Sequence, residues 1–380
     1  MHLMQSPPGP ETKVDDCQYL YFCGTGYLGL HGHADLIQAS IEATRAYGLG
    51  TATSRSGYGN APPIIEVEEL AARFWDSEAA YYFASGYLGN HVVLSVLAKP
   101  GSVFLLDENS HYSVVDACRC FDLPTYQFAH LEAEALRELL KDRLRPGQVP
   151  IVLSDGVFAS SGAIAPVKEY LDVLEDIEGA MLCLDDCHAF GVLGERGCGT
   201  FEHHGIPQRG INELPPNQDI AGSPRLFAVG TLSKAFGGYG GIIAGTNTFI
   251  ESARSSSHYY SGASAPPIPV AAASAMALKL VANTPNLVAG VKQNALRLKQ
   301  GLNDLGLEIE LTPVPIVSLE LGDSQNMRRI QHGLAEEGIL IDYKSEYAGL
   351  GARGALRIAV FATHTEEMIK KLTEAFGRHL

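Results

Sequence analysis

The feature that most constrains the fold is a repeated alternation of short apolar runs with helix-like segments between residues 62 and 231. The runs are short enough to be buried strands, and the segments between them carry apolar residues at helical spacing. The expected strands cover residues 81–84, 102–106, 150–153, 180–184 and 226–229. Such alternation is typical of a mostly parallel sheet with helices on both faces, so we predict an α/β fold. Ligands of such sheets bind at the carboxyl ends of the strands.

Helical signals continue beyond this region and suggest how the chain is divided. The expected helices lie at residues 35–47, from 62 onward, 85–97, 131–144, 167–177, 271–288 and 292–305. In the first of them, Leu36, Ile37 and Ile41 share an apolar face. Residues 203–225 contain several prolines and glycines and predict a long surface loop. The expected units are an N-terminal arm and helix over 1–47, a large domain over 48–270 and a small C-terminal domain over 271–380.

Charge and cysteine content narrow the classes of partner and compartment. The 28 basic and 43 acidic residues leave a formal charge of -15, which disfavours binding to nucleic acid or to anionic membranes. No apolar run reaches membrane-spanning length, and the first residues lack the charged and apolar regions of a signal peptide. The seven scattered cysteines favour reduced thiols over a disulfide framework. We therefore expect a soluble, cytoplasmic protein.

One lysine stands between an expected strand and a glycine-rich turn. Lys234 follows the strand at 226–229 and precedes Gly237-Gly-Tyr-Gly-Gly241. A lysine that is held among small groups and partly removed from water becomes a usable nucleophile. That property suits a lysine that forms a Schiff base with a carbonyl compound. The alternative is a surface lysine in a loop.

Two carboxylates and a histidine follow the apolar run at 180–184. In Asp185-Asp-Cys-His188 the strand end would leave Asp185 buried, and a buried carboxylate needs a cationic partner. The protonated pyridine nitrogen of pyridoxal phosphate is such a partner, and the pairing keeps the ring an electron sink. His188 could reach the phenolic oxygen of the same ring. The alternative is a capped helix start, with Asp185 or Asp186 as the N-cap.

Three further features fit the same cofactor. Ser85-Gly-Tyr87 stands at a helix start, where free N–H groups and the helix dipole favour a phosphate. His111 follows an expected strand and could stack on a flat ring or move protons. Arg357 lies in an apolar, strand-like run and needs an anion, such as a substrate carboxylate. The corresponding alternatives are simple helix capping, a loop histidine and a structural salt bridge.

Taken in chain order, these features resemble the α-oxoamine synthase family of fold type I pyridoxal phosphate enzymes. The matching stretches are residues 27–30, 83–90, 110–113, 155–158, 165–166, 185–188, 191–194, 231–234, 265–267, 356–357 and 363–365. They cover nearly the whole chain from about residue 19. The resemblance implies a mostly parallel seven-stranded sheet flanked by helices, with a smaller α+β C-terminal domain.

The resemblance also implies roles for the residues around the cofactor. Lys234 matches the Schiff-base lysine, Asp185 the aspartate on the pyridine nitrogen, and His188 the histidine on the phenolic oxygen. His111 matches the histidine stacked over the ring. The positions that match ligands of the cofactor phosphate are Ser85, Gly86, Tyr87 and Thr231, with Ser264 near the segment by which a neighbouring subunit reaches it.

The substrate side departs from the family pattern. Arg357 matches the arginine for the substrate carboxylate, but Thr25 stands where the family has an asparagine that often contacts that group. The glycine-rich Gly-Ser-Gly-Gly-Ser-Arg loop reads Gly50-Thr-Ala-Thr-Ser-Arg55, and Ala159 replaces a serine. The usual Asp-Glu-Ala-His of the family reads Asp185-Asp-Cys-His188. The cofactor-binding residues are thus largely kept, while the substrate and acyl-donor side is altered.

The reaction implied is an acyl transfer. An α-amino acid would condense with an acyl thioester, carried by coenzyme A or a carrier protein, to give an α-aminoketone, carbon dioxide and free thiol. Lys234 would be the base that takes the Cα proton. The second hypothesis is an aminotransferase or an aldol-type amino acid lyase, because the same carbanion serves all three reactions. The resemblance implies a homodimer with active sites at the subunit boundary.

A metal-binding module is the third hypothesis. The side chains that suggest it are Cys183, Cys187, His188, Cys198, His203 and His204. Their spacings fit no tight zinc pattern, and Cys183 and Cys187 lie among residues with an expected cofactor role. We therefore expect no metal site and interpret these cysteines as free buried thiols.

Overall fold

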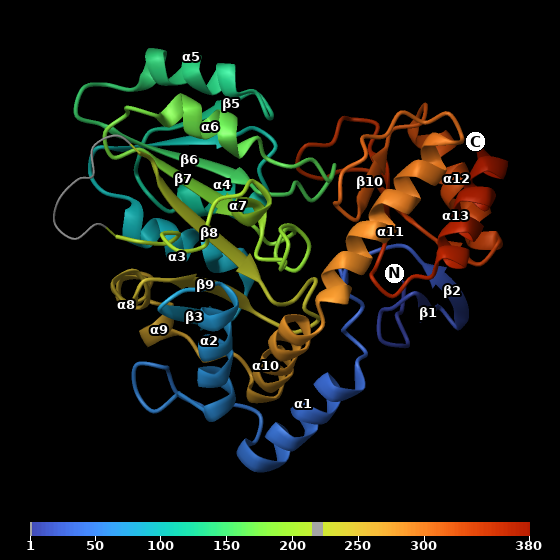
Figure 1. The fold of residues 1–380 in the computed structure, drawn as a ribbon, viewed down its shortest axis with the longest axis horizontal. Helices are drawn as coiled ribbons and strands as arrows, with labels where there is room; N and C mark the ends of the chain where they lie inside the picture. The colour runs from blue at the N-terminus through green and yellow to red at the C-terminus, as the bar shows by residue number, and fades with distance from the viewer. Residues whose placement is uncertain (1, 215–222) are drawn as a thin grey trace.

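The computed structural model describes residues 2–214 and 223–380, which are built around one large sheet (Figure 1). Its seven strands run in the order β3-β9-β8-β7-β6-β4-β5. They are β3 Ala79–Phe83, β4 Ser102–Asp107, β5 Thr125–Phe128, β6 Val149–Asp155, β7 Met181–Asp185, β8 Arg225–Thr231 and β9 Gly241–Gly245. Strand β9 is antiparallel to both neighbours, and the pairs from β8 to β5 are parallel. The predicted mostly parallel seven-stranded sheet is confirmed.

Helices cover both faces of this sheet. They are α2 Pro62–Phe74, η1 Gly86–Leu88, α3 Gly89–Leu97, α4 Tyr112–Arg119, α5 Ala133–Arg143, α6 Val167–Leu174, α7 Thr200–His203, α8 Asn247–Ser256 and α9 Tyr259–Gly262. In β4, Phe104 and Leu106 pack in an apolar cluster with α3, α4 and α8, whereas Val103 and Leu105 pack with α5 and α6. Because both faces are buried, a ligand can reach the sheet at its strand ends.

The C-terminal part has its own sheet and apolar cluster. Its elements are α10 Ile268–Asn283, α11 Pro285–Asn303, β10 Ile316–Leu319, α12 Ser324–Glu336, β11 Ile339–Leu340, β12 Asp342–Lys344, β13 Ala355–Ala359 and α13 Glu366–His379. Strands β10, β13 and β12 form one antiparallel sheet. The N-terminal strand β1 Glu11–Val14 pairs with β2 Cys17–Tyr21, and β2 pairs with β11. The beginning of the chain therefore lies beside this part (Figure 1).

Several predicted boundaries were wrong. The helix expected over 271–288 ends at Asn283, because Pro285 begins the next helix and cannot continue the first. Helix α11 therefore starts seven residues before the expected 292. Helix α4 and strands β5 and β9 were not predicted; β9 begins in a glycine-rich stretch that reads as a turn. In the predicted loop 203–225, residues 215–222 lie outside the described part.

Helix α1, Ala34–Tyr47, confirms the helix predicted over 35–47 and packs against α10. Its expected apolar face is only partly covered in the single chain. Leu36 is buried, but Ile37 and Ile41 are 45% and 40% exposed.

Among the described residues, no helix is long and apolar enough to cross a bilayer.

Candidate active site

A cavity of about 350 Å³ lies where the carboxyl ends of the central strands face the sheet β10-β13-β12. It brings together every sequence-predicted site residue except Ser264. The predicted residues that line it are Thr25, Ser85, Gly86, Tyr87, His111, Asp185, His188, Thr231, Lys234 and Arg357. Residues that the sequence did not single out also line it, including Ser113, Asp155, Lys344 and Tyr347. Residues far apart in the chain therefore converge on one site.

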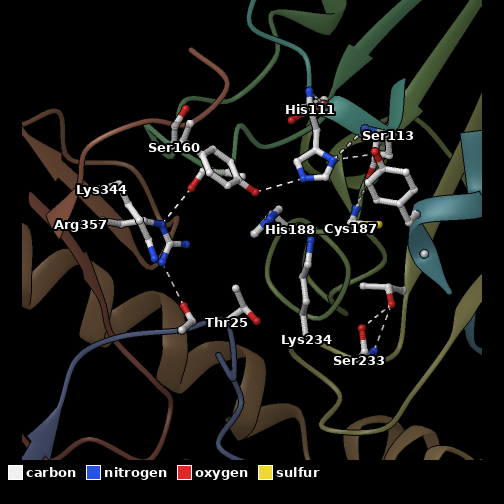
Figure 2. A pocket seen from close by; sticks show the side chains of 18 of the residues that line it. Thr25, His111, Ser113, Ser160, Cys187, His188, Ser233, Lys234, Lys344 and Arg357 are labelled. Atoms are coloured by element: carbon white, nitrogen blue, oxygen red, sulfur yellow. Dashed lines mark hydrogen bonds between the residues drawn. The ribbon is translucent and has the colours of Figure 1, made fainter. Parts of the chain in front are cut away.

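Lys234 lies in the turn between β8 and β9 and extends into the cavity (Figure 2). The turn is closed by a hydrogen bond from the Gly237 amide to the Lys234 carbonyl at 3.1 Å. Gly237 has φ of +66°, and a Cβ there would lie 2.8 Å from the His31 nitrogen, so a glycine is needed. The Lys234 amine has no hydrogen bond or ion pair to another residue in the described ranges. It is therefore a half-buried amine that can react with a ligand.

Asp185 ends strand β7 and is buried. Its carboxylate accepts hydrogen bonds from Asn90 Nδ2 at 2.7 Å, Ser113 Oγ at 3.2 Å and the Cys187 amide at 3.0 Å. All three donors are neutral, and within the described part of the chain no cationic side chain pairs with it. A buried carboxylate with only neutral donors beside a cavity suits a cationic ligand group.

A second buried carboxylate stands beside the first. Asp155 ends β6 and is opposite Asp185 in the register of β6 and β7. Burial and the charge of Asp185 raise the pKa of Asp155 well above its usual range. Asp155 Oδ1 accepts the backbone N–H of His111 at 3.0 Å. Asp155 therefore positions the segment that carries His111.

His188 is linked to Arg357 through Tyr27. The Tyr27 hydroxyl lies 2.7 Å from His188 Nδ1 and accepts from Arg357 Nη2 at 3.2 Å. Because arginine can only donate and Tyr27 is fully buried, the Tyr27 hydrogen points to His188 Nδ1. Burial and the charge of Lys234 hold the pKa of His188 well below its usual range. The neutral ring then carries its proton on Nε2, which is free to donate to a ligand oxygen.

Arg357 lies in the middle of β13, which confirms the strand-like run predicted around it. Its other two hydrogen bonds go to the Ala159 carbonyl at 2.9 Å and the Gly24 carbonyl at 3.1 Å. Figure 2 shows its side chain near Thr25, which follows Gly24. The guanidinium is buried, and no carboxylate is within ion-pair distance of it among the residues described. Such a charge is suited to bind an anionic substrate group.

His111 caps helix α4 and is held at both ring nitrogens (Figure 2). Nδ1 lies 3.2 Å from the Ser113 amide and 2.8 Å from Ser113 Oγ, and Nε2 lies 3.1 Å from the Tyr347 hydroxyl. Burial lowers the pKa of His111, although the charge of Asp185 opposes this. The ring is therefore a neutral, oriented group at the cavity wall.

Hydroxyl and amide groups gather where β3 and β8 end. The Ser85 side chain accepts the Tyr87 amide at 3.3 Å at the start of η1. A Cβ on Gly86 would lie 2.8 Å from Thr231 Cβ, so the two segments touch. Thr231 Oγ1 is 2.8 Å from Ser233 Oγ. The Tyr87 hydroxyl instead donates to Asp116 at 2.5 Å. Neutral hydroxyl and N–H donors at a helix start suit a phosphate group.

Ser264 does not line the cavity of its own chain. It forms an isolated bridge with Ser54, in the altered loop that precedes Arg55. Arg55 anchors this loop: it is buried and donates to both oxygens of Glu68, at 2.5 and 2.8 Å. Arg254 donates to the same carboxylate at 3.0 Å. The loop is therefore tied to the edge of the large sheet rather than to the cavity.

Tyr27, Asn90, Ser113, Asp155 and Tyr347 contact the predicted residues but were not assigned a role from the sequence. Tyr27, Asn90 and Asp155 fall inside the stretches that carry the family resemblance, which was a usable signal. Ser113 follows His111 by two residues and also lies in such a stretch. Tyr347 lies in none, and nothing in its local sequence indicates a functional residue.

Comparisons with known proteins agree with this fold. The family model described as aminotransferase class I and II matches residues 20–376. An 8-amino-7-oxononanoate synthase of Cellvibrio japonicus is 33% identical over 376 residues, covering 99% of this chain and 90% of the relative. One of Symbiobacterium thermophilum is 30% identical over 375 residues, covering 99% and 92%.

Solved structures show the same likeness in three dimensions. The serine palmitoyltransferase of Sphingomonas wittichii is 27% identical and superposes with a TM-score of 0.89, over 100% of this chain and 91% of that one. A serine palmitoyltransferase of S. paucimobilis, solved with bound pyridoxal phosphate and myriocin, is 26% identical. It also has a TM-score of 0.89 and covers 100% of this chain and 92% of its own.

Proposed function

Since this chain belongs to the α-oxoamine synthase family, a group of pyridoxal phosphate-dependent acyltransferases, we propose that its cavity is the site where an α-amino acid condenses with an acyl thioester. The products are an α-aminoketone, carbon dioxide and free thiol. One observation supports this assignment above the others. A single cavity holds an amine without a partner, a carboxylate with only neutral donors and a guanidinium with only neutral acceptors, all within the described part. These are Lys234, Asp185 and Arg357.

The residues present fit pyridoxal 5'-phosphate, the cofactor of this enzyme family. Asp185 offers the charge that a protonated ring nitrogen needs, and His188 Nε2–H is free to meet the phenolic oxygen. His111 supplies a flat ring at the cavity wall, and Lys234 the amine for covalent attachment. The groups suited to hold the phosphate are Ser85, Gly86, Tyr87, Thr231 and, from a neighbouring subunit, Ser264. When bound, the cofactor withdraws electrons from the substrate Cα.

The remaining steps fall to side chains of this chain. Arg357, with Thr25 beside it, holds the α-carboxylate of the amino acid through charge-assisted hydrogen bonds. Lys234 Nζ accepts the proton removed from Cα and later returns a proton there. Because Asp185 and His188 are buried and already fixed by Asn90, Ser113 and Tyr27, they need no reorganisation during the reaction.

The products decide between this reaction and the second hypothesis, an aminotransferase or aldol-type lyase. Purified enzyme would be incubated with single amino acids and an acyl-CoA series, with thiol and carbon dioxide measured together. We expect the two to appear in equal amounts and only when both substrates are present. A keto acid or an aldehyde formed without thiol release would instead assign the rival reaction to this cavity.

We also propose a homodimer that works in the cytoplasm. The exposed apolar side chains Ile37, Ile41 and Leu49, which is 72% exposed, favour a covering partner at and just after α1. Ser264 lies outside the cavity of its own chain, in keeping with a role in the cavity of a neighbouring subunit. Light scattering tests the dimer.

All seven cysteines are free, as expected of a protein in a reducing compartment. The division of the chain into units at residues 47 and 270 is likewise our proposal, favoured by the separate apolar cluster of the C-terminal part.

A further inference from the structure

Tyr347 reaches the cavity from the C-terminal part of the chain. It follows β12 in a turn in which the Leu350 amide donates to the Tyr347 carbonyl at 3.1 Å. Two residues on, Gly349 has φ of +77°, and a Cβ there would lie 3.0 Å from Asn109 Cβ. The turn is thus pressed against the segment that leads into His111. The Tyr347 ring also packs on Tyr112, with centroids 5.6 Å apart. This side chain is held in place from two sides.

The hydrogen bonds around His111 determine which atom carries each proton. A backbone N–H can only donate, so the Ser113 amide makes Nδ1 of His111 an acceptor. The neutral ring therefore carries its proton on Nε2 and donates it to the Tyr347 oxygen, 3.1 Å away. The single hydrogen of the Ser113 hydroxyl lies between two acceptors, His111 Nδ1 at 2.8 Å and Asp185 Oδ2 at 3.2 Å from Oγ. The phenolic hydrogen of Tyr347 is the one donor in this series that no described residue accepts.

Burial keeps this hydrogen in place. It raises the pKa of Tyr347, although the charge of Arg357 opposes the rise. Tyr347 is therefore a neutral phenol at physiological pH, and its hydroxyl keeps a hydrogen that can be donated in a hydrogen bond. Tyr347 and Arg357 line the same cavity, and Arg357 is the expected site of the amino acid carboxylate. The free hydroxyl hydrogen is thus available to the second substrate.

We propose that the Tyr347 hydroxyl donates a hydrogen bond to the carbonyl oxygen of the acyl thioester, with His111 Nε2–H fixing its orientation. This inference rests on the proposed function. As the amino acid Cα bonds to the thioester carbon, the carbonyl oxygen gains negative charge. That charge returns when the C=O bond re-forms and the C–S bond breaks, and the departing thiolate takes up a proton. Tyr347 stabilises the oxygen while the charge is present and keeps its own proton throughout.

Tyr347→Phe tests the proposal, because it keeps the ring and removes only the hydroxyl. Two rates are compared. Exchange of the amino acid Cα hydrogen with deuterium from solvent needs no acyl donor, whereas thiol release requires one. We expect kcat for thiol release to fall about 100-fold, as when one oxyanion donor is removed, and exchange to stay within about twofold of the wild type. The KM for the acyl donor should change little, because the hydrogen bond from Tyr347 strengthens only as negative charge develops on the carbonyl oxygen.

Tyr112→Phe is the matched control. Tyr112 stands beside His111, contacts the Tyr347 ring and is 45% exposed, and the change removes its hydroxyl in the same way. It should leave both rates within about twofold of wild type. An unchanged rate of thiol release in Tyr347→Phe would overturn the proposal. An equal loss of exchange and thiol release would also overturn it, because Tyr347 would then act on the amino acid step through His111. Wild-type enzyme that releases no thiol with any acyl thioester would refute the proposed function itself.

Discussion

The hydroxyl of Tyr27 lies 2.7 Å from Nδ1 of His188. Tyr27 comes from the segment after β2 and His188 from the segment after β7, so the two meet only in the folded chain. The same hydroxyl accepts from Arg357 Nη2. One buried phenol therefore sets the tautomer of a cofactor-site histidine and helps orient the arginine expected to bind substrate. Cofactor and substrate sites share this contact.

Tyr27→Phe should impair both sites at once. It leaves His188 Nδ1 and one Arg357 N–H without a partner in a buried setting, which costs about 1–3 kcal/mol of stability. We expect weaker cofactor binding together with a higher KM for the amino acid, measured by cofactor titration and steady-state kinetics. Tyr170→Phe is the control, because Tyr170 is equally buried but packs in the cluster of α5 and α6. A change in neither constant for Tyr27→Phe would contradict the shared role.

Arg357→Lys should raise the KM for the amino acid about 10- to 100-fold, the range expected for loss of a charge-assisted hydrogen bond. Lysine keeps the charge but cannot make the three bonds of the guanidinium and also bind a carboxylate. Arg353→Lys is the control, since Arg353 is exposed and pairs with Glu320. The KM for the acyl donor serves as an internal reference. An equal rise in both KM values would argue against a carboxylate site at Arg357.

Glu68→Gln should destabilise the protein by about 3–5 kcal/mol, because Arg55 and Arg254 would lose the anion they share. Arg55 is 3% exposed, so its charge would be left buried. Glu66→Gln is a control on the same helix: Glu66 pairs with Lys279 at the surface, and its loss should cost at most about 1 kcal/mol. Urea unfolding measures both. Similar values for the two variants would show that the buried cluster contributes no more than a surface pair.

The buried His364 should make the folded protein less stable as the pH falls below about 6.5. Burial lowers the pKa of His364 to about 4, while the hydrogen bond from its Nε2 to the Tyr21 carbonyl opposes the shift. The unfolded chain binds the proton at the ordinary value of 6.5, so acid favours unfolding. The stability that the neutral His364 ring contributes is fully present above pH 6.5. It is lost as the pH falls toward 4, by about 1.4 kcal/mol per pH unit.

The comparison of wild type with His364→Asn isolates this effect from the other buried histidines. Unfolding free energies at pH 7.5 and pH 5 should differ by about 2 kcal/mol more in the wild type than in the variant. His332→Asn is the control, since His332 is at the surface. An equal pH dependence in wild type and His364→Asn would mean that His364 does not resist protonation in the fold.

The central sheet and most of the cavity could be predicted because their signals are local. Apolar runs mark strands such as β7, and polar residues that follow them, such as Asp185, must stand at the strand end. Strand β9 could not be predicted this way, because its glycines resemble the turn before it. The end of α10 was missed because apolar residues at helical spacing continue on both sides of Thr284 and hide the break at Pro285.

The contacts that orient the site could not be predicted, because they join segments far apart in the chain. Asn90 reaches Asp185 from helix α3, and Tyr27 reaches His188 across 161 positions. Tyr347 meets His111 only because the turn after β12 lies against the segment that leads into His111. Periodicity indicates which face of an element is buried. It does not indicate which side chains on two distant elements will meet.

Mapping the site of covalent cofactor attachment tests the central claim most directly. Holoenzyme would be treated with borohydride, digested, and its peptides analysed by mass spectrometry. The account predicts a pyridoxyl phosphate group on Lys234 and no such group in Lys234→Ala. Lys344 lines the same cavity and serves as the internal comparison. Attachment at Lys344 would contradict the assignment of Lys234 and the mechanism built on it. So would the absence of any attached group in protein whose absorption spectrum shows that the cofactor is bound.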